Sequence, residues 1–191
     1  MPRVTTAFAA AVALFLPIGR PLLVGQTPVD GIGAGLLSTQ AAYAQNATDL
    51  LNSGLDKAKS GNLKGAIADW TKAIEIYPKY ALAYYNRGLA RKKLGDFKGA
   101  IADYTKAIEI DPQYALAYNN RGTAKHSSKD YQGALSDYTK AIVIDPNDSD
   151  YYYNRGNSKR KLGDLKGACT DWRKAAELGD TDAAEFVRDQ C

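Results

Sequence analysis

The clearest pattern along the chain is a helical spacing of apolar positions that returns at a fixed interval. Ile67, Trp70, Ala73 and Ile74 are spaced as on one face of a helix, and the same spacing recurs in three later segments. A stretch rich in Ala, Leu, Lys and Tyr precedes each of these segments. The pattern predicts pairs of α-helices, and no segment has the alternation typical of a β-strand.

The interval between the copies is 34 residues, as the close match of KGAIADYTKAIEIDP at 98–112 to the segments at 64–78 and 132–146 illustrates. Repeats of this length indicate helical units that bury their apolar faces only against neighbouring units. We therefore predict an all-α solenoid domain at 45–182, followed by a capping helix at 183–191. Its four helix-turn-helix repeats are placed at 47–80, 81–114, 115–148 and 149–182.

Turn residues mark the helix ends inside each repeat. A Gly often ends one helix, and an Asp or Asn directly after it can cap the next. Such pairs stand at 61–62, 95–96 and 163–164. Pro78, Pro112 and Pro146 come after the second helix, which we expect to end before each proline.

The small and aromatic positions of the units resemble those of the tetratricopeptide repeat (TPR) family over residues 47–182. The family pattern has a small residue at the eighth position, supplied here by Gly54, Gly88, Gly122 and Gly156. It has an aromatic residue at the twenty-fourth, supplied by Trp70, Tyr104, Tyr138 and Trp172. The resemblance implies a superhelix of repeats whose concave groove binds segments of other proteins.

Basic residues stand at the seventh position of three repeats, where the family usually has Leu: Arg87, Arg121 and Arg155. This face of the helix packs on its neighbours, and an unpaired buried Arg would cost several kcal/mol. Each therefore needs a carboxylate, and the second helices offer one per repeat at Asp69, Asp103, Asp137 and Asp171. The repeated pairs indicate a structural role rather than an active site.

Two pairing schemes are open for these charges. Pairing within a repeat would leave Asp69 alone, because the first repeat has Ser53 at the seventh position. Pairing with the preceding repeat leaves only Asp171 without an Arg from the repeats, and Arg188 of the capping helix is a candidate partner for it. We favour the second scheme, with the pairs Asp69–Arg87, Asp103–Arg121 and Asp137–Arg155 fixing the register between repeats.

Polar residues of the first helices are predicted to line the concave groove. The sixth position carries one Asn per repeat: Asn52, Asn86, Asn120 and Asn154. An amide both donates and accepts, so four exposed amides in register could hold a peptide backbone; alternatively, they cap local groups and face water. Around them we expect Tyr85, Asn119, Tyr153, Thr123, Asn157, Lys92 and Lys93, a basic and aromatic set that favours an acidic peptide.

One specialised groove is disfavoured. Family members that clamp the C-terminal carboxylate of heat-shock chaperones use Lys and Asn in one repeat, Asn in the next, and Lys and Arg in the third. In the first three repeats those positions hold Leu51, Leu55, Asn86, Leu116 and Asn120. Of these five residues, only Asn86 matches the residue type that the clamp uses.

The N-terminus differs in composition from the repeats. Residues 1–29 contain Arg3 and Arg20 without an acid, an apolar run at 7–18 follows the start, and Ala42-Tyr43-Ala44 matches a signal-peptidase site. We expect 1–44 to be a signal peptide or targeting leader; the alternatives are a disordered tail or a membrane tether. The style of the repeats resembles exported bacterial, especially cyanobacterial, TPR proteins, which implies the periplasm or the thylakoid lumen.

Both cysteines lie near the C-terminal end, at Cys169 and Cys191. In an oxidising compartment they could form a disulfide that pins the capping helix, and the alternative is two free thiols. His126 is the single histidine and stands without neighbours at metal-ligand spacing, so no metal or cofactor is expected.

The charge balance and the missing motifs narrow the function. The 25 basic and 21 acidic residues are interleaved, which disfavours nucleic-acid binding. No phosphate loop or nucleophile motif is present, which disfavours an enzyme. We therefore expect a non-catalytic scaffold that binds a peptide segment of a protein partner in its concave groove and assists the assembly of membrane complexes. The alternative is a structural protein that associates with itself.

Overall fold

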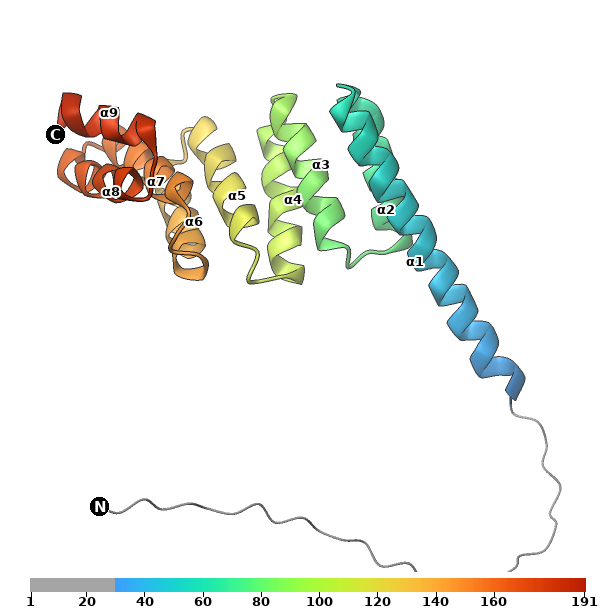
Figure 1. Ribbon diagram of the computed structural model, residues 1–191. Helices are drawn as coiled ribbons and strands as arrows, with labels where there is room; N and C mark the ends of the chain where they lie inside the picture. The colour runs from blue at the N-terminus through green and yellow to red at the C-terminus, as the bar shows by residue number, and fades with distance from the viewer. Residues whose placement is uncertain (1–29) are drawn as a thin grey trace, which may run out of the picture.

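The computed structural model describes residues 30–191, with the side chains from 45 onward, so most of the expected leader at 1–44 lies outside the described residues. Figure 1 shows the described part as a row of helices and no strands. The helices are α1 (Asp30–Lys59), α2 (Leu63–Ile76), α3 (Ala81–Lys93), α4 (Phe97–Ile110), α5 (Ala115–Ser127), α6 (Tyr131–Ile144), α7 (Ser149–Lys161), α8 (Leu165–Glu177) and α9 (Thr181–Gln190). Helix α1 thus begins well before the first repeat and continues through the expected cleavage position at Gln45.

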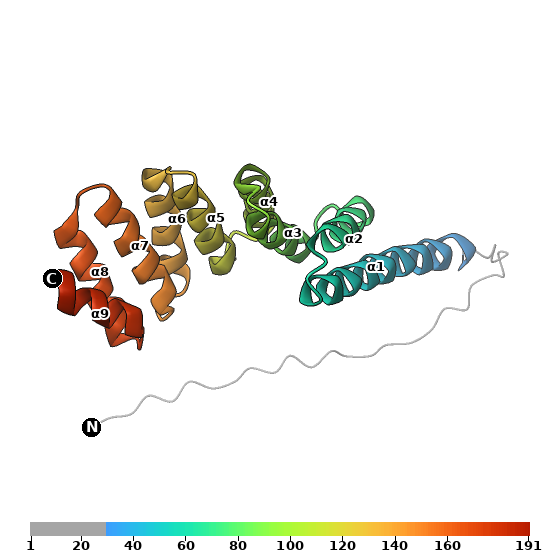
Figure 2. The same ribbon diagram turned by 90° about the horizontal axis from the view of Figure 1, so that it is seen from above.

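Consecutive helices pair as α1–α2, α3–α4, α5–α6 and α7–α8, and α9 packs against α8. Each first helix also contacts the first helix of the next repeat (α1–α3, α3–α5, α5–α7), and the second helices make no comparable contact with one another. The row therefore curves with its first helices inside, and Figure 2 shows α1 and α3 on the inner side of this arc. We call the side formed by α1, α3, α5 and α7 the concave face. The predicted all-α solenoid is confirmed.

The predicted turn chemistry is also confirmed. The Asp96 side chain caps α4 by accepting from the Gly99 backbone N–H at 2.9 Å, and Asn62 caps α2 in the same way. Gly61 and Gly95 adopt positive φ values of 83° and 82°, a conformation that favours Gly. The third repeat has Lys129 at this point, with φ 66°.

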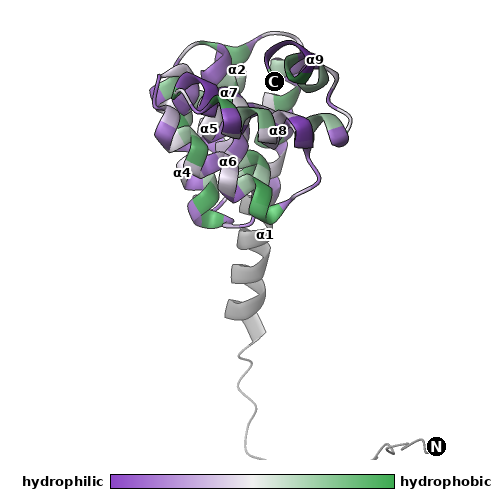
Figure 3. Ribbon diagram, turned by 90° about the vertical axis from the view of Figure 1, so that its left-hand side faces the viewer, coloured by the Kyte–Doolittle hydropathy of each residue, from purple (hydrophilic) through white to green (hydrophobic). Residues whose placement is uncertain are grey.

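The core between helices depends on the small residues of the eighth position. A Cβ atom on Gly88 would lie 2.8 Å from a ring carbon of Tyr104, which is closer than packed atoms allow, so Gly lets the two helices of the repeat approach. Tyr104 and Tyr138 are at most 1% exposed, as are the alanines around them. Figure 3 shows hydrophobic and hydrophilic segments interspersed along the helices, as expected for helices that bury one face each.

Helix α9 covers the C-terminal end of the array. The Phe186 ring stacks on Trp172 with the ring centroids 5.0 Å apart. A disulfide joins Cys169 of α8 to Cys191 directly after α9, with the two Cα atoms 5.7 Å apart. The end of α9 is therefore tied covalently to the last repeat.

Candidate functional site

The charges inside the repeats are paired, although not as the favoured scheme predicted. Arg87 donates from Nη2 and Nε to Asp103 of its own repeat at 2.7 and 3.0 Å. Arg121 and Arg155 form the same forked pair with Asp137 and Asp171. The predicted pairs Asp69–Arg87, Asp103–Arg121 and Asp137–Arg155 are wrong, because the seventh and twenty-third positions face each other across the helix pair of one repeat.

A second cation joins each of these carboxylates from the eleventh position. Arg91 Nη1 lies 2.9 Å from Asp103 Oδ2, and Lys125 and Lys159 occupy the same place in the next two repeats. This position also explains why Asp69 is not left alone, since Lys57 and Ser53 both donate to it at 2.6 Å.

The predicted partner of Asp171 in the capping helix is wrong as well. Arg188 is 72% exposed and contacts Glu185 and Asp189 of its own helix.

In the first repeat, burial opposes ionisation of Asp69. The hydrogen bonds from Lys57 and Ser53 outweigh this effect and hold the pKa of that carboxyl below its ordinary value.

The arginines still connect neighbouring repeats, through hydroxyl groups. Arg87 Nη1 donates to Thr71 Oγ1 of the preceding repeat at 3.0 Å, and the pairs Arg121–Thr105 and Arg155–Thr139 repeat this bond. Each guanidinium thus joins an Asp of its own repeat to a Thr of the one before. Because these charged side chains bind one another inside the array, we assign them a structural role.

The asparagines of the sixth position do not form a ladder of four exposed amides. Asn52 is exposed, Asn120 and Asn154 are half-buried, and Asn86 is only 8% exposed. Asn119, expected beside the ladder, is also 8% exposed. The helical period predicts which face of the first helix carries these residues. How deeply each side chain is buried depends on the side chains that lie opposite it.

Two of these asparagines connect repeats to each other. Asn120 accepts from Lys92 Nζ at 2.7 Å and donates to the Tyr85 hydroxyl at 3.1 Å. Asn154 donates to Asn119 Oδ1 at 3.1 Å. Burial and the neighbouring charge of Lys93 lower the pKa of the Lys92 ammonium. These hydrogen bonds join the first helices of neighbouring repeats, α3 to α5 and α5 to α7.

The C-terminal half of the concave face is polar and also largely self-paired. Thr123 donates to the Asn119 carbonyl, and Tyr153 packs near Phe186 with the centroids 5.9 Å apart. His126 Nδ1 lies 2.8 Å from Ser158 Oγ. Asn157 is an exception, because its Oδ1 atom is buried without a hydrogen-bond partner in the described part of the chain.

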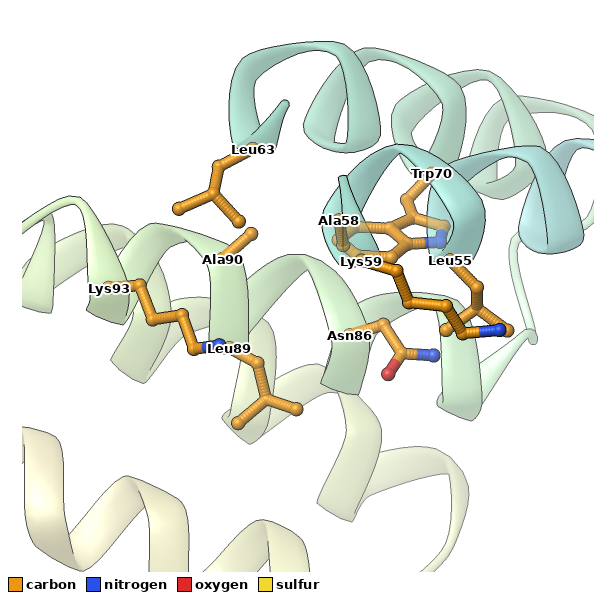
Figure 4. Close-up of a pocket in the computed structure, with 9 residues that line it drawn as sticks. All are labelled: Leu55, Ala58, Lys59, Leu63, Trp70, Asn86, Leu89, Ala90 and Lys93. Carbon is orange, nitrogen blue, oxygen red and sulfur yellow. The ribbon is translucent and has the colours of Figure 1, made fainter. Parts of the chain in front are cut away.

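A pocket between the first two repeats was not predicted from the sequence pattern. It has a volume of about 250 Å³ and lies between α1, α2 and α3. Its lining consists of Leu55, Ala58, Lys59, Leu63, Trp70, Asn86, Leu89, Ala90 and Lys93. Figure 4 shows Asn86 between Leu55 and Lys59 on one side and Leu89 and Lys93 on the other. Of the predicted groove residues, only Asn86 and Lys93 belong to this pocket.

In the part of the chain that the structure describes, no group of three or more His, Cys, Asp or Glu side chains is placed to hold a metal ion. Among the described residues, no helix is both long and apolar enough to cross a membrane.

Comparison with known proteins identifies the repeats. Models of the tetratricopeptide repeat match residues 81–114, 115–148 and 137–170, and a model of the TPR repeat matches 54–95. No curated protein sequence matches the chain.

Solved structures similar to the array include the crystal structure of MamA, with 26% identity and a TM-score of 0.69 over 81% of this chain and 91% of that chain. The first TPR of Spaghetti (RPAP3), bound to the HSP90 peptide SRMEEVD, has 26% identity and a TM-score of 0.62 over 63% of this chain and 95% of that chain. The Arabidopsis OM64 TPR domain has 28% identity and a TM-score of 0.61 over 62% and 98%. With its repeated helix pairs and these matches, the chain belongs to the tetratricopeptide repeat family.

Proposed function

We propose that this protein is a non-catalytic scaffold that binds a segment of a partner protein on its concave face. The observation that carries the proposal is the pocket between α1, α2 and α3, which is lined by the Asn86 amide, a group that has no hydrogen-bond partner among the described residues. The similar TPR of Spaghetti was solved with a peptide bound, which supports the same use of the fold here. Charges elsewhere in the repeats are paired with one another, which supports a scaffold rather than an enzyme.

The proposal is tested by selecting binders from a displayed library of random peptides. Leu82, on α3 of the concave face, and Val143, on the outer helix α6, are both exposed apolar residues, at 41% and 74%. We expect Leu82→Arg to weaken binding of the selected peptides and Val143→Arg to leave it unchanged. Equal binding by both variants would contradict a concave-face site.

The same preparations test the alternative of self-association. If no peptide is selected and the chain forms larger species as its concentration rises in sedimentation experiments, the chain is a self-associating structural protein. Monomeric wild-type protein that binds the selected peptides supports the scaffold.

We also propose that the chain is exported to the periplasm or thylakoid lumen and assists the assembly of membrane complexes there. The leader pattern at 1–44 and the Cys169–Cys191 disulfide, which needs oxidising conditions, support export. Among the side chains of α1 that the structure describes, from Gln45 onward, the first buried one is Ala47, so a chain that begins at Gln45 would keep all of these buried side chains. N-terminal sequencing of the native protein tests this: a start at Met1 in a cytoplasmic fraction would refute it.

A further inference from the structure

We propose that the pocket between the first two repeats binds an aliphatic side chain of the partner together with the carboxylate of an adjacent Asp or Glu. This inference rests on the proposed function, since it defines which segment the concave face takes. Three features of the pocket carry it: an apolar floor, an unpartnered amide and two lysines at the rim.

The floor is apolar and large enough for a side chain. Leu55, Leu63 and Leu89 are half-buried around the opening, and Trp70 is 2% exposed beneath them. The volume of about 250 Å³ exceeds the roughly 150 Å³ of an engineered apolar cavity that takes up benzene in another protein. Burial of an aliphatic side chain here would remove apolar surface of both partners from water.

Asn86 supplies the polar contact. Its side chain is 8% exposed and makes no hydrogen bond with any described residue, whereas Asn120 and Asn154, at the same position of the next repeats, are both hydrogen-bonded. Unlike Asn157 Oδ1, which is fully enclosed, the Asn86 amide atoms keep access to solvent through the pocket. A ligand that accepts from the Asn86 Nδ2 group would use this free donor.

The two lysines indicate that the accepting group is anionic. Lys59 contacts only Asp56, at 3.5 Å with both side chains 78% exposed, and an exposed contact of this kind holds the ammonium weakly. Lys93 has no carboxylate partner among the described residues, and Lys92 lies beside it. Of the residues that the structure describes, no acidic one lines the pocket, so donors and positive charge surround the Asn86 amide.

The carboxylate is assigned to an acidic side chain within the segment rather than to a free C-terminus. The positions that would supply Lys and Asn to a C-terminal carboxylate in the first repeat hold Leu51 and Leu55. Leu51 is 4% exposed, and Leu55 forms part of the apolar floor. A Leu-Glu or Leu-Asp pair within a segment places an aliphatic side chain next to a carboxylate, so no free C-terminus is required.

The probes are short Gly/Ser peptides, blocked at both ends, that contain Leu-Glu, Leu-Gln or Ser-Glu at the centre. A fourth probe is the same background ending in Leu with a free carboxylate. Binding is followed by NMR titration of the ¹⁵N-labelled chain, which measures weak affinities and locates the perturbed residues. We expect Leu-Glu to perturb α1 and α3 around Asn86 and to bind about tenfold more tightly than either matched probe, a difference of roughly 1.4 kcal/mol.

Matched variants assign each contact. The double variant Lys59→Gln plus Lys93→Gln changes exposed residues, and it should weaken Leu-Glu about tenfold while leaving Leu-Gln unchanged, with Lys98→Gln as the control. Asn86→Leu should weaken both probes, and Asn52→Leu, at the same position of the first repeat, should weaken neither. If Asn86→Leu does not fold, as its thermal unfolding will show, the lysine variants still decide the question.

Several outcomes would overturn the inference. Equal binding of Leu-Glu and Leu-Gln would exclude the carboxylate, and tighter binding of the free C-terminal probe would assign it to a chain end. Pocket shifts that appear on concentrating the chain alone would identify a second copy as the occupant. If library-selected peptides bind the concave face without perturbing Asn86, this inference fails and the proposed function stands; if no peptide binds anywhere, both fail.

Discussion

Replacement of Asp103 by Asn tests the internal charge network of the repeats. Asp103 accepts three hydrogen bonds, at 2.7 and 3.0 Å from Arg87 and at 2.9 Å from Arg91, and its side chain is 3% exposed. The Arg87 side chain is 12% exposed, so loss of the carboxylate charge leaves a buried cation uncompensated. We expect Asp103→Asn to lower the free energy of unfolding by about 3–5 kcal/mol.

Asp69→Asn provides a matched comparison in the first repeat. Its cation, Lys57, is 40% exposed and can turn to water when the carboxylate is lost, so we expect a smaller cost of about 1–2 kcal/mol. Urea unfolding followed by far-UV circular dichroism measures both variants. Equal costs for Asp103→Asn and Asp69→Asn would refute the argument from burial.

A double-mutant cycle tests the assignment of partners. Arg87 with Asp103 should show a coupling free energy of about 1–3 kcal/mol, and Arg87 with Asp69 less than about 0.5 kcal/mol. Stronger coupling of Arg87 to Asp69 would mean that the charges pair between repeats.

The remaining predictions concern stability at four other places. Tyr104→Phe removes a buried hydroxyl that has no hydrogen-bond partner within residues 45–191, so the variant should be more stable by about 1 kcal/mol in urea unfolding. Lys129→Gly relieves a positive φ of 66° and should also stabilise by about 1 kcal/mol; a loss of stability would contradict this reading. Cys191→Ser opens a covalent link across 22 residues and should cost about 3 kcal/mol, with reductant lowering the wild type equally and the variant not at all. Burial, then nearby basic side chains, lower the pKa of His126, so the unfolded chain takes up a proton more readily. Stability should fall as the pH drops through about 6.5 toward the folded pKa, and His126→Gln should remove this step.

The architecture could be predicted from the sequence because local signals agree with one another. The period of 34, the Gly-Asp pairs and the prolines each mark the same helices, and the eighth-position glycines explain how those helices approach. The start of α1 at Asp30 was not predicted, since residues before 47 lie outside the repeat pattern.

The pairing of charges required geometry that spacing alone does not supply. Asp69 and Asp103 lie 18 and 16 residues from Arg87, so both were compatible with a helix pair. Lys57 at the eleventh position of the first repeat was the signal that could have decided the matter, because it gives Asp69 a cation within its own repeat.

The pocket could not be predicted because it depends on how three helices pack. The period places Asn86 on the same face as Asn120. Only the packed structure shows that Asn120 bonds to Lys92, whereas Asn86 bonds to no described residue. Leu63 also lines the pocket, although it lies at the start of α2, a second helix, and not on a first helix.

The central claim is that partner segments bind on the concave face and enter the pocket at Asn86. A crystal structure of the array with a peptide selected from the library tests it most directly. The account predicts the peptide along α1 and α3, with an aliphatic side chain in the pocket and a carboxylate within hydrogen-bonding distance of Asn86 Nδ2. A peptide seated on the outer helices α2, α4 or α6, with the pocket empty, would contradict it.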